Sequence, residues 1–214
     1  MFVNPSKPAG LSPVDSVTAS KWTGKLNLYC ILSTDTNPFW PGDLVVPTGA
    51  GDTNGIPVVT LATAGNPAVG VFYSGGIGFQ QGGGMGGPYI NPNNLTTNSI
   101  PATKNGLNYY IAVTDDPNTL YEIQEGGSGT NLTGAALQTN YNILYAAPAT
   151  GVYVSGTTLN NASGGTSSAL NLKLIRLVQR VDNHLVTSPA TGGGGQKWLV
   201  MINNHVYRAG TTGI

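Results

Sequence analysis

The imidazole side chains are the first candidates for chemistry in this sequence, and there are only two of them, His184 and His205. Neither has a cysteine or a second histidine at the spacing that metal ligands require. A hydrolytic triad would have to be assembled from distant parts of the chain. We therefore expect the histidines to bond with their own loops, and the sequence predicts no catalytic residues, no enzyme activity and no cofactor.

Four carboxylates lie close together in the sequence and suggest a calcium site: Asp115, Asp116, Glu122 and Glu125. Calcium prefers several carboxylate and carbonyl oxygens around one centre. However, the Asp-x-Asp-x-Gly spacing of calcium loops is missing, and a proline interrupts the group. We expect turn chemistry in place of a metal site.

Four consecutive residues predict that structural turn: Asp115, Asp116, Pro117 and Asn118. Proline fixes its own φ and favours extended geometry in the residue before it. The Asp and Asn side chains can bond to the nearby backbone. Two runs rich in Tyr, Ile and Val flank the turn, Tyr109–Val113 and Leu120–Ile123, so the stretch predicts a β-hairpin.

Aromatic side chains could form the floor of a sugar-binding site, although aromatic residues are more often strand core. Seven come into question: Trp22, Trp40, Tyr109, Tyr110, Tyr141, Tyr145 and Tyr153. The sequence leaves both interpretations open.

The charge balance excludes several partners. Nine basic and nine acidic residues among 214 give a net charge of zero, and charged residues make up 8% of the chain, against roughly 25% in ordinary domains. The one basic cluster, formed by Lys173, Arg176 and Arg180, is too sparse for nucleic acid. A chain with so little charge is poorly protected against self-association.

The remaining composition indicates a packed protein with many loops. Glycine occurs 31 times, yet hydrophobic residues reach 40%, with 10 Tyr and 3 Trp. The single cysteine, Cys30, lies in an apolar run and is expected to be a buried hydrophobe. No apolar run approaches the ~20 residues that span a bilayer, and MFVNPSKPAG lacks the regions of a signal peptide. We expect synthesis in a cytoplasm and no membrane partner.

Short runs with period-two alternation predict an all-β fold, either a small β-barrel, β-tulip-like, or a sandwich. Pro38–Asp43 predicts a turn, and Ala169–Val181 favours a strand over a helix. The segment from Trp40 to Tyr73 predicts a β-meander. The other expected strands are Lys25–Leu32, Leu44–Val46, Val58–Ala62, Ala68–Tyr73, Tyr141–Ala146, Gly151–Val154 and Lys197–Asn203.

Two segments are candidates for contact with a partner. Residues 1–24 contain prolines at positions 5, 8 and 13 and predict an extended N-terminal arm before a domain at 25–214. A Gly-rich insertion at about 75–105 is either a flexible surface loop or a contact loop. The arm likewise is either an assembly contact or a disordered terminus. The expected contact residues are Phe2, Val3, Asn4, Pro5, Met85, Tyr89 and Ile90.

Four stretches together resemble the head decoration (capsid cement) proteins of podovirus-like tailed phages. They are PGDLVV…GIPVVTLATAGNPAVGVFYS, YYIAVTDDPNTLYEIQE, LKLIRLVQRVDN and KWLVMINNHVYRAGTTGI, and the resemblance covers roughly residues 40–214. It implies a β-rich protein on the outside of a virion, bound to a major capsid protein of the HK97-like fold and stabilising the head. It also implies a homo-oligomer, a trimer in preference to a dimer, and no catalytic residues. A phage protein of this kind would be synthesised in the host bacterial cytoplasm.

Two other functions remain open from the sequence. A carbohydrate- or receptor-binding virion module, fibre-like and also all-β, would be equally rich in Tyr and Asn. A hydrolase is disfavoured because the acid/base cluster is missing.

Overall fold

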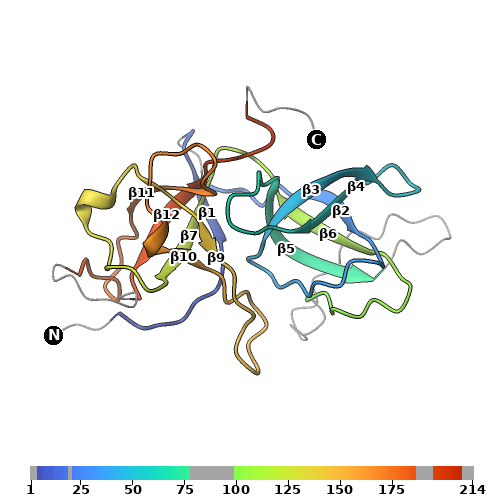
Figure 1. Cartoon of the computed structure of the whole chain (residues 1–214), viewed down its shortest axis with the longest axis horizontal. Helices are drawn as coiled ribbons and strands as arrows, with labels where there is room; N and C mark the ends of the chain where they lie inside the picture. Colours follow the sequence, from blue (N-terminus) through green and yellow to red (C-terminus); the bar gives the residue numbers. More distant parts are fainter. Residues whose placement is uncertain (1–3, 19–20, 78–98, 187–194, 209–214) are drawn as a thin grey trace.

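The computed structural model describes residues 4–18, 21–77, 99–186 and 195–208, and these residues form two β-sheets (Figure 1). Within them the secondary structure consists of twelve strands and two 3₁₀ segments, η2 (Gly134–Ala136) and η3 (Asn161–Ser163). The predicted all-β class and the predicted barrel are therefore confirmed. No helix among these residues has the length and apolar character needed to cross a bilayer.

The first sheet is a closed barrel in the order β2-β4-β3-β5-β6, with β6 also pairing with β2. Its interior holds alternate residues of each strand, such as Ile31, Val45 and Phe72, all less than 1% exposed. The strands are β2 (Asn27–Ile31), β3 (Leu44–Gly51), β4 (Pro57–Leu61), β5 (Gly70–Ile77) and β6 (Tyr109–Thr114).

The second sheet has seven strands, with the path β8-β11-β12-β7-β10-β9 and β1 paired beside β7. The predicted strand within Ala169–Val181 is confirmed as β11, whose Leu172 and Leu174 are fully buried. The strands are β1 (Ser12–Ser16), β7 (Thr119–Gly126), β8 (Asn140–Tyr141), β9 (Ile143–Leu144), β10 (Thr158–Asn160), β11 (Leu172–Leu177) and β12 (Lys197–Ile202).

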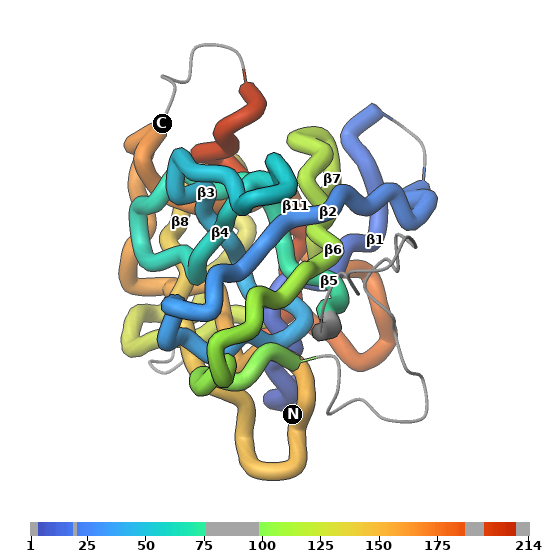
Figure 2. The backbone as a smooth tube through the Cα atoms, turned by 90° about the vertical axis from the view of Figure 1, so that its right-hand side faces the viewer, coloured from blue at the N-terminus to red at the C-terminus, as the bar shows by residue number. Residues whose placement is uncertain are grey.

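The barrel and the sheet share a hydrophobic core, which places them side by side in both views (Figures 1 and 2). Leu44 of β3 and Val71 of β5 belong to the same buried cluster as Tyr121 of β7 and Trp198 of β12. These barrel strands are thus apolar on both faces, one toward the barrel interior and one toward the sheet. Burying each such side chain contributes about 1.5–3 kcal/mol.

The predicted hairpin around Asp115–Asn118 is wrong. Strand β6 pairs with β2 and β5 in the barrel, whereas β7 pairs with β1, β12 and β10 in the other sheet. The turn itself is present, since the N–H of Thr119 donates to the carbonyl of Asp116 at 3.0 Å. It connects the two sheets. The predicted meander is also wrong in its pairing, because β5 pairs with β3 and not with β4.

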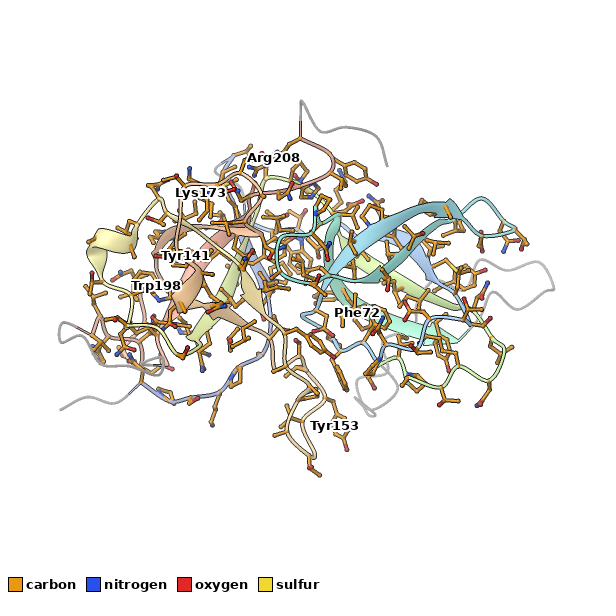
Figure 3. The ribbon with its side chains drawn as sticks, viewed as in Figure 1. Phe72, Tyr141, Tyr153, Lys173, Trp198 and Arg208 are labelled. Atoms are coloured by element: carbon orange, nitrogen blue, oxygen red, sulfur yellow. The ribbon has the colours of Figure 1, made fainter. Side chains whose placement is uncertain are left out.

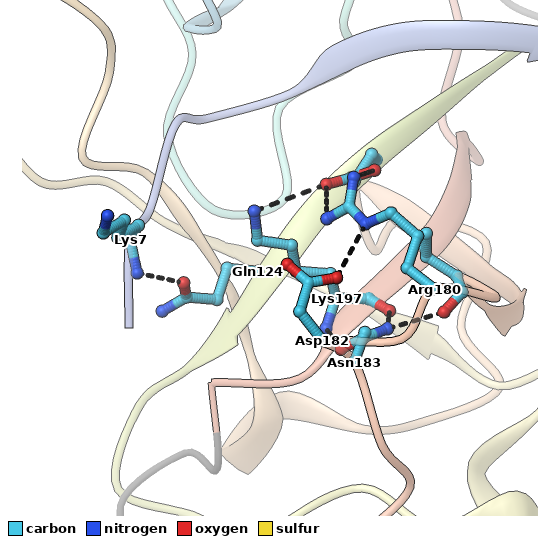
Figure 4. A network of polar contacts seen from close by, with 8 residues as sticks. Lys7, Gln124, Arg180, Asp182, Asn183 and Lys197 are labelled. Carbon is cyan, nitrogen blue, oxygen red and sulfur yellow. Dashed lines mark hydrogen bonds and ion pairs between the residues drawn. The ribbon is translucent and has the colours of Figure 1, made fainter. Parts of the chain in front are cut away.

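Residues 4–18 of the predicted N-terminal arm contact the rest of the chain. Asn4 is 6% exposed and forms two hydrogen bonds with the backbone of His184. The N–H of Lys7 donates to Gln124 (Figure 4), Leu11 is 1% exposed, and β1 pairs with β7. Pro5 is exposed. The other expected contact residues, Phe2, Val3, Met85, Tyr89 and Ile90, lie outside the described residues.

The predicted strand at Gly151–Val154 is wrong as well, because these residues belong to a loop. Residues 145–157, between β9 and β10, project from the body of the molecule in both views (Figures 1 and 2). One proline, Pro148, and many small residues in this stretch leave few side chains to pack. We call this segment the projecting loop.

Candidate functional site

Asp43 joins the base of the projecting loop to the barrel. Its side chain is fully buried and accepts hydrogen bonds from the Ser155 hydroxyl at 2.5 Å, the Thr157 hydroxyl at 3.3 Å and the Trp40 N–H at 2.8 Å. Burial raises the pKa of Asp43 to about 6, while these hydrogen bonds lower it. The predicted turn supplies the geometry, since the Asp43 N–H also donates to the Trp40 carbonyl.

Two glycines let the N-terminal segment cross this turn at close range. Gly10 and Gly42 both have positive φ, at 63° and 98°, and the Leu11 N–H donates to the Gly42 carbonyl at 2.9 Å. A Cβ at position 10 would lie 2.5 Å from the Gly42 oxygen. Glycine is thus required on both sides of the crossing.

An aromatic groove with a volume of about 400 Å³ lies between these segments and the barrel. Its walls come from the N-terminal segment, the turn at Pro41, strand β5 and the projecting loop, whose tip carries Tyr153 (Figure 3). The lining includes Pro13, Trp22, Pro41, Tyr73 and Tyr153, and none of the described side chains in it is charged. The Trp22 and Tyr73 rings contact each other, with centroids 5.2 Å apart and planes inclined at 52°.

The seven aromatic residues considered for a sugar site are divided by the structure. Tyr109, Tyr110 and Tyr141 are at most 7% exposed and belong to the core. Only Trp22 and Tyr153 line the groove. Both residues were among the seven candidates, but nothing in the sequence distinguishes them from the aromatic residues of the core.

Asp115 occupies a buried polar junction between the two sheets. Its carboxylate accepts two hydrogen bonds from the Asn27 amide, at 2.8 and 2.9 Å, and one from the Tyr29 hydroxyl at 2.7 Å. Since Tyr29 donates its proton there, the hydroxyl of Tyr207 must donate to Tyr29, 2.8 Å away. Burial, followed by the bonds to Tyr207 and Asp115, raises the pKa of Tyr29.

The C-terminal segment closes this junction. Arg208 donates to the carbonyl of Pro117 at 2.9 Å, and the Nδ1 atom of buried His205 accepts the N–H of Tyr207 at 3.1 Å. Burial chiefly, together with Arg208, lowers the pKa of His205 to about 4. His205 therefore bonds with its own loop, as expected, and is neutral at pH 7.

The four carboxylates considered for calcium are each engaged separately. Glu122 pairs with Arg180 at 2.9 Å and with Lys197 at 3.5 Å, and Arg180 also pairs with Asp182 (Figure 4). Glu125 accepts bonds from Gln196, Trp198, Asn161 and the Leu132 N–H. Among the described residues, no three His, Cys, Asp or Glu side chains converge as a metal site.

Replacing Asp116 by alanine should lower the free energy of unfolding by about 1 kcal/mol, because its Oδ1 accepts the Asn118 N–H at 2.8 Å and fixes the turn. Asp116→Asn keeps an acceptor and should recover most of the loss, as measured by urea denaturation. A melting temperature that rises by several degrees with calcium in the wild type alone would favour the metal hypothesis instead.

Two further ionisable groups are buried. Burial raises the pKa of the Cys30 thiol to about 11, so Cys30 is an unreactive core residue.

Lys104 is 2% exposed, lies over the Phe39 ring, and has its pKa lowered by burial. Its ammonium nitrogen lies within hydrogen-bond distance of four backbone carbonyls, which share its three N–H donors: those of Asp35 (2.5 Å), Asn37 (2.9 Å), Pro101 (3.1 Å) and Ala102 (3.4 Å).

Comparison with known proteins identifies no relative: no family model, no curated protein and no solved structure matches this chain.

Proposed function

We propose that this chain is a structural decoration protein of a tailed-phage head. It binds the outer surface of a shell of major capsid proteins with the HK97-like fold and stabilises that shell, without catalysis. In this proposal it acts as a homo-oligomer, a trimer in preference to a dimer, and is part of the virion exterior.

The observation that carries this proposal is where the most specific pieces of the resemblance lie. The DDPN stretch and the closing INNHVYR stretch meet at the junction of the two sheets, where Arg208 contacts Pro117 and Tyr207 contacts Tyr29. Two stretches that lie far apart in the sequence thus form one structural unit. An uncharged groove and a charge-poor chain also suit a protein that binds through shape and apolar area.

A carbohydrate- or receptor-binding virion module is the second candidate. The observation that favours it is the pair of aromatic side chains, Trp22 and Tyr153, that line one groove. Such side chains combine a large apolar face with a polar atom, which suits a ligand with both kinds of surface.

A sedimentation assay with purified undecorated heads tests the first candidate. We expect the full-length protein to bind at a fixed stoichiometry, to form a regular array in electron micrographs, and to raise the temperature at which the heads rupture. No co-sedimentation, combined with glycan binding by the isolated protein, would support the second candidate and contradict the first.

The same assay can examine the tip of the N-terminal arm. Deleting residues 2–13 would remove Leu11 and the start of β1, so weaker binding would then reflect damage to the fold. Deleting only Phe2 and Val3 keeps Asn4 and its two bonds to His184. Weaker head binding by this shorter deletion is the expected result if the tip is an assembly contact.

A further inference from the structure

A second pocket, with a volume of about 370 Å³, lies on the barrel beside strand β4. Strands β2 and β4 pair at a single position, Cys30 with Val58, and residues 32–37 then run beside β4 as a loop. The pocket lies between this loop and the strand. Its lining is rich in polar side chains, with four threonines, Asp35 and Asn37.

The polar side chains of the loop and of the strand meet between the two walls of this pocket. The Thr60 hydroxyl donates to Asp35 Oδ2 at 2.7 Å, and the Asn37 amide nitrogen lies 3.5 Å from the same hydroxyl. Because these contacts join opposite walls, the atoms that make them face the pocket. Asp35, Asn37 and Thr60 are each partly or fully exposed, so a ligand reaches them without moving the walls.

Two oxygen atoms in this cluster can accept a further hydrogen bond. Among the described residues, Asp35 Oδ2 accepts from the Thr60 hydroxyl alone, and Asn37 Oδ1 accepts from no donor. Each of these oxygens has two lone pairs. The Asn37 amide is held in place because its Nδ2 donates to Asp35 Oδ1 at 2.9 Å. A ligand that completes the cluster therefore supplies hydrogen-bond donors.

The charges around the loop favour a neutral ligand. Asp35 is the one charged residue in the lining, and the buried ammonium group of Lys104 lies under the same loop, against the carbonyls of Asp35 and Asn37. Every Asp, Glu, Lys and Arg of the chain is among the described residues, so no further charge enters this balance. With one charge of each sign on the loop, neither a cation nor an anion gains a strong net attraction.

We propose that this pocket binds a neutral saccharide, whose neighbouring hydroxyls donate to Asp35 Oδ2 and Asn37 Oδ1. Its C–H groups face Leu32, a half-buried apolar residue of the lining. Small-molecule sites combine an apolar lining with a few convergent polar groups in this way. The aromatic groove suits a saccharide less well, since its described lining contains no carboxylate and no amide side chain. The inference rests on the second candidate function, glycan binding, and names its site and ligand class.

Titration of the ¹⁵N-labelled full-length chain tests the proposal. The probes are the methyl glycosides of glucose, galactose and mannose. We expect at least one of them to shift the amide signals of residues 34–37 and of Thr60 in a saturable way, with a Kd of about 1 mM. Tetrahydropyran-2-methanol has the same ring without the ring hydroxyls and should shift none of these signals. The indole signal of buried Trp198 should stay in place.

The chain contains the tripeptide Asp-Thr-Asn a second time, at residues 52–54, and this copy supplies a matched control. There the backbone N–H and the amide of Asn54 donate to Asp52, as those of Asn37 donate to Asp35, but residues 52–54 do not line the pocket. Asn37→Ala removes one acceptor and should weaken binding by about fivefold. Asn54→Ala should leave the Kd unchanged. Near-ultraviolet circular dichroism checks that both variants are folded.

The outcomes separate this inference from the function on which it rests. Saturable shifts confined to another site, such as the Trp22 indole, would overturn the pocket assignment and leave glycan binding standing. No saturable shift with any of the three glycosides would overturn both. Equal affinity of wild type and Asn37→Ala, or of a glycoside and tetrahydropyran-2-methanol, would overturn the assigned contacts. The head-decoration proposal is tested separately, by co-sedimentation, and none of these results changes that assay.

Discussion

Stability of the wild-type protein should fall by about 2 kcal/mol between pH 4 and pH 7 relative to an Asp43→Asn variant. The pKa of Asp43 is about 6 in the folded protein because of burial, above the ordinary value of 3.8. The folded state therefore binds this proton more tightly than the unfolded state. Stability is highest below pH 4 and is lost as the pH rises through 6.

Urea denaturation across this pH range measures the effect. Asp43→Asn cannot titrate, yet its amide can still accept from the Trp40 N–H and bond to Ser155. Asp43→Ala cannot titrate either, and because it removes the acceptor for three donors it should be about 3 kcal/mol less stable than Asp43→Asn at every pH. Asp182→Asn, at an exposed site, should keep the wild-type slope. The same pH slope in wild type and Asp43→Asn would contradict the prediction.

Replacing Lys104 by methionine should lower the free energy of unfolding by about 3 kcal/mol or more. Methionine can occupy much of the same space against Phe39, but it removes the donor to the carbonyls of Asp35 and Asn37. Hydrogen bonds to a charged group contribute about 1.5–3 kcal/mol, so the loss of these two accounts for the expected effect.

Chemical denaturation gives the size of this effect, and hydrogen exchange gives its location. Exchange should rise first in the loops around residues 35–37 and 101–104, which the ammonium group joins. Lys25→Met, at an exposed position, is the control and should change stability by less than about 0.5 kcal/mol. A loss as small as that of the control would mean that water satisfies the carbonyls of Lys104→Met.

The sequence predicted most strands because their signal is local. Alternation in Lys25–Leu32 and Lys197–Asn203 depends only on the residues within each run, and β2 and β12 lie there. The strand predicted at Gly151–Val154 does not form, because so short an apolar run has no neighbouring strand to pair with. Residues 12–16 were missed because prolines usually argue against strands, whereas β1 pairs only with β7 and carries an irregularity after Pro13.

Pairing could not be predicted from turn chemistry. The turn at Asp116 forms as expected, yet the strands beside it join different sheets because their apolar faces have better partners elsewhere. The same limit applies to the site. Asp43 was placed in a turn from its neighbours, but its partner Ser155 comes from a loop far along the chain. Only the folded chain brings Trp22 and Tyr153 to one groove.

The pairing of β1 with β7 has a consequence for the order of folding during synthesis. All barrel strands lie within residues 27–114, so the ribosome releases the complete barrel sequence as one continuous stretch. Ser12 precedes the barrel in the sequence but pairs with Glu122, which emerges only after the barrel. Domains form in the order in which their sequences emerge. The N-terminal strand must therefore wait, unpaired, until the barrel beside it has been released, and it then becomes an edge of the second sheet.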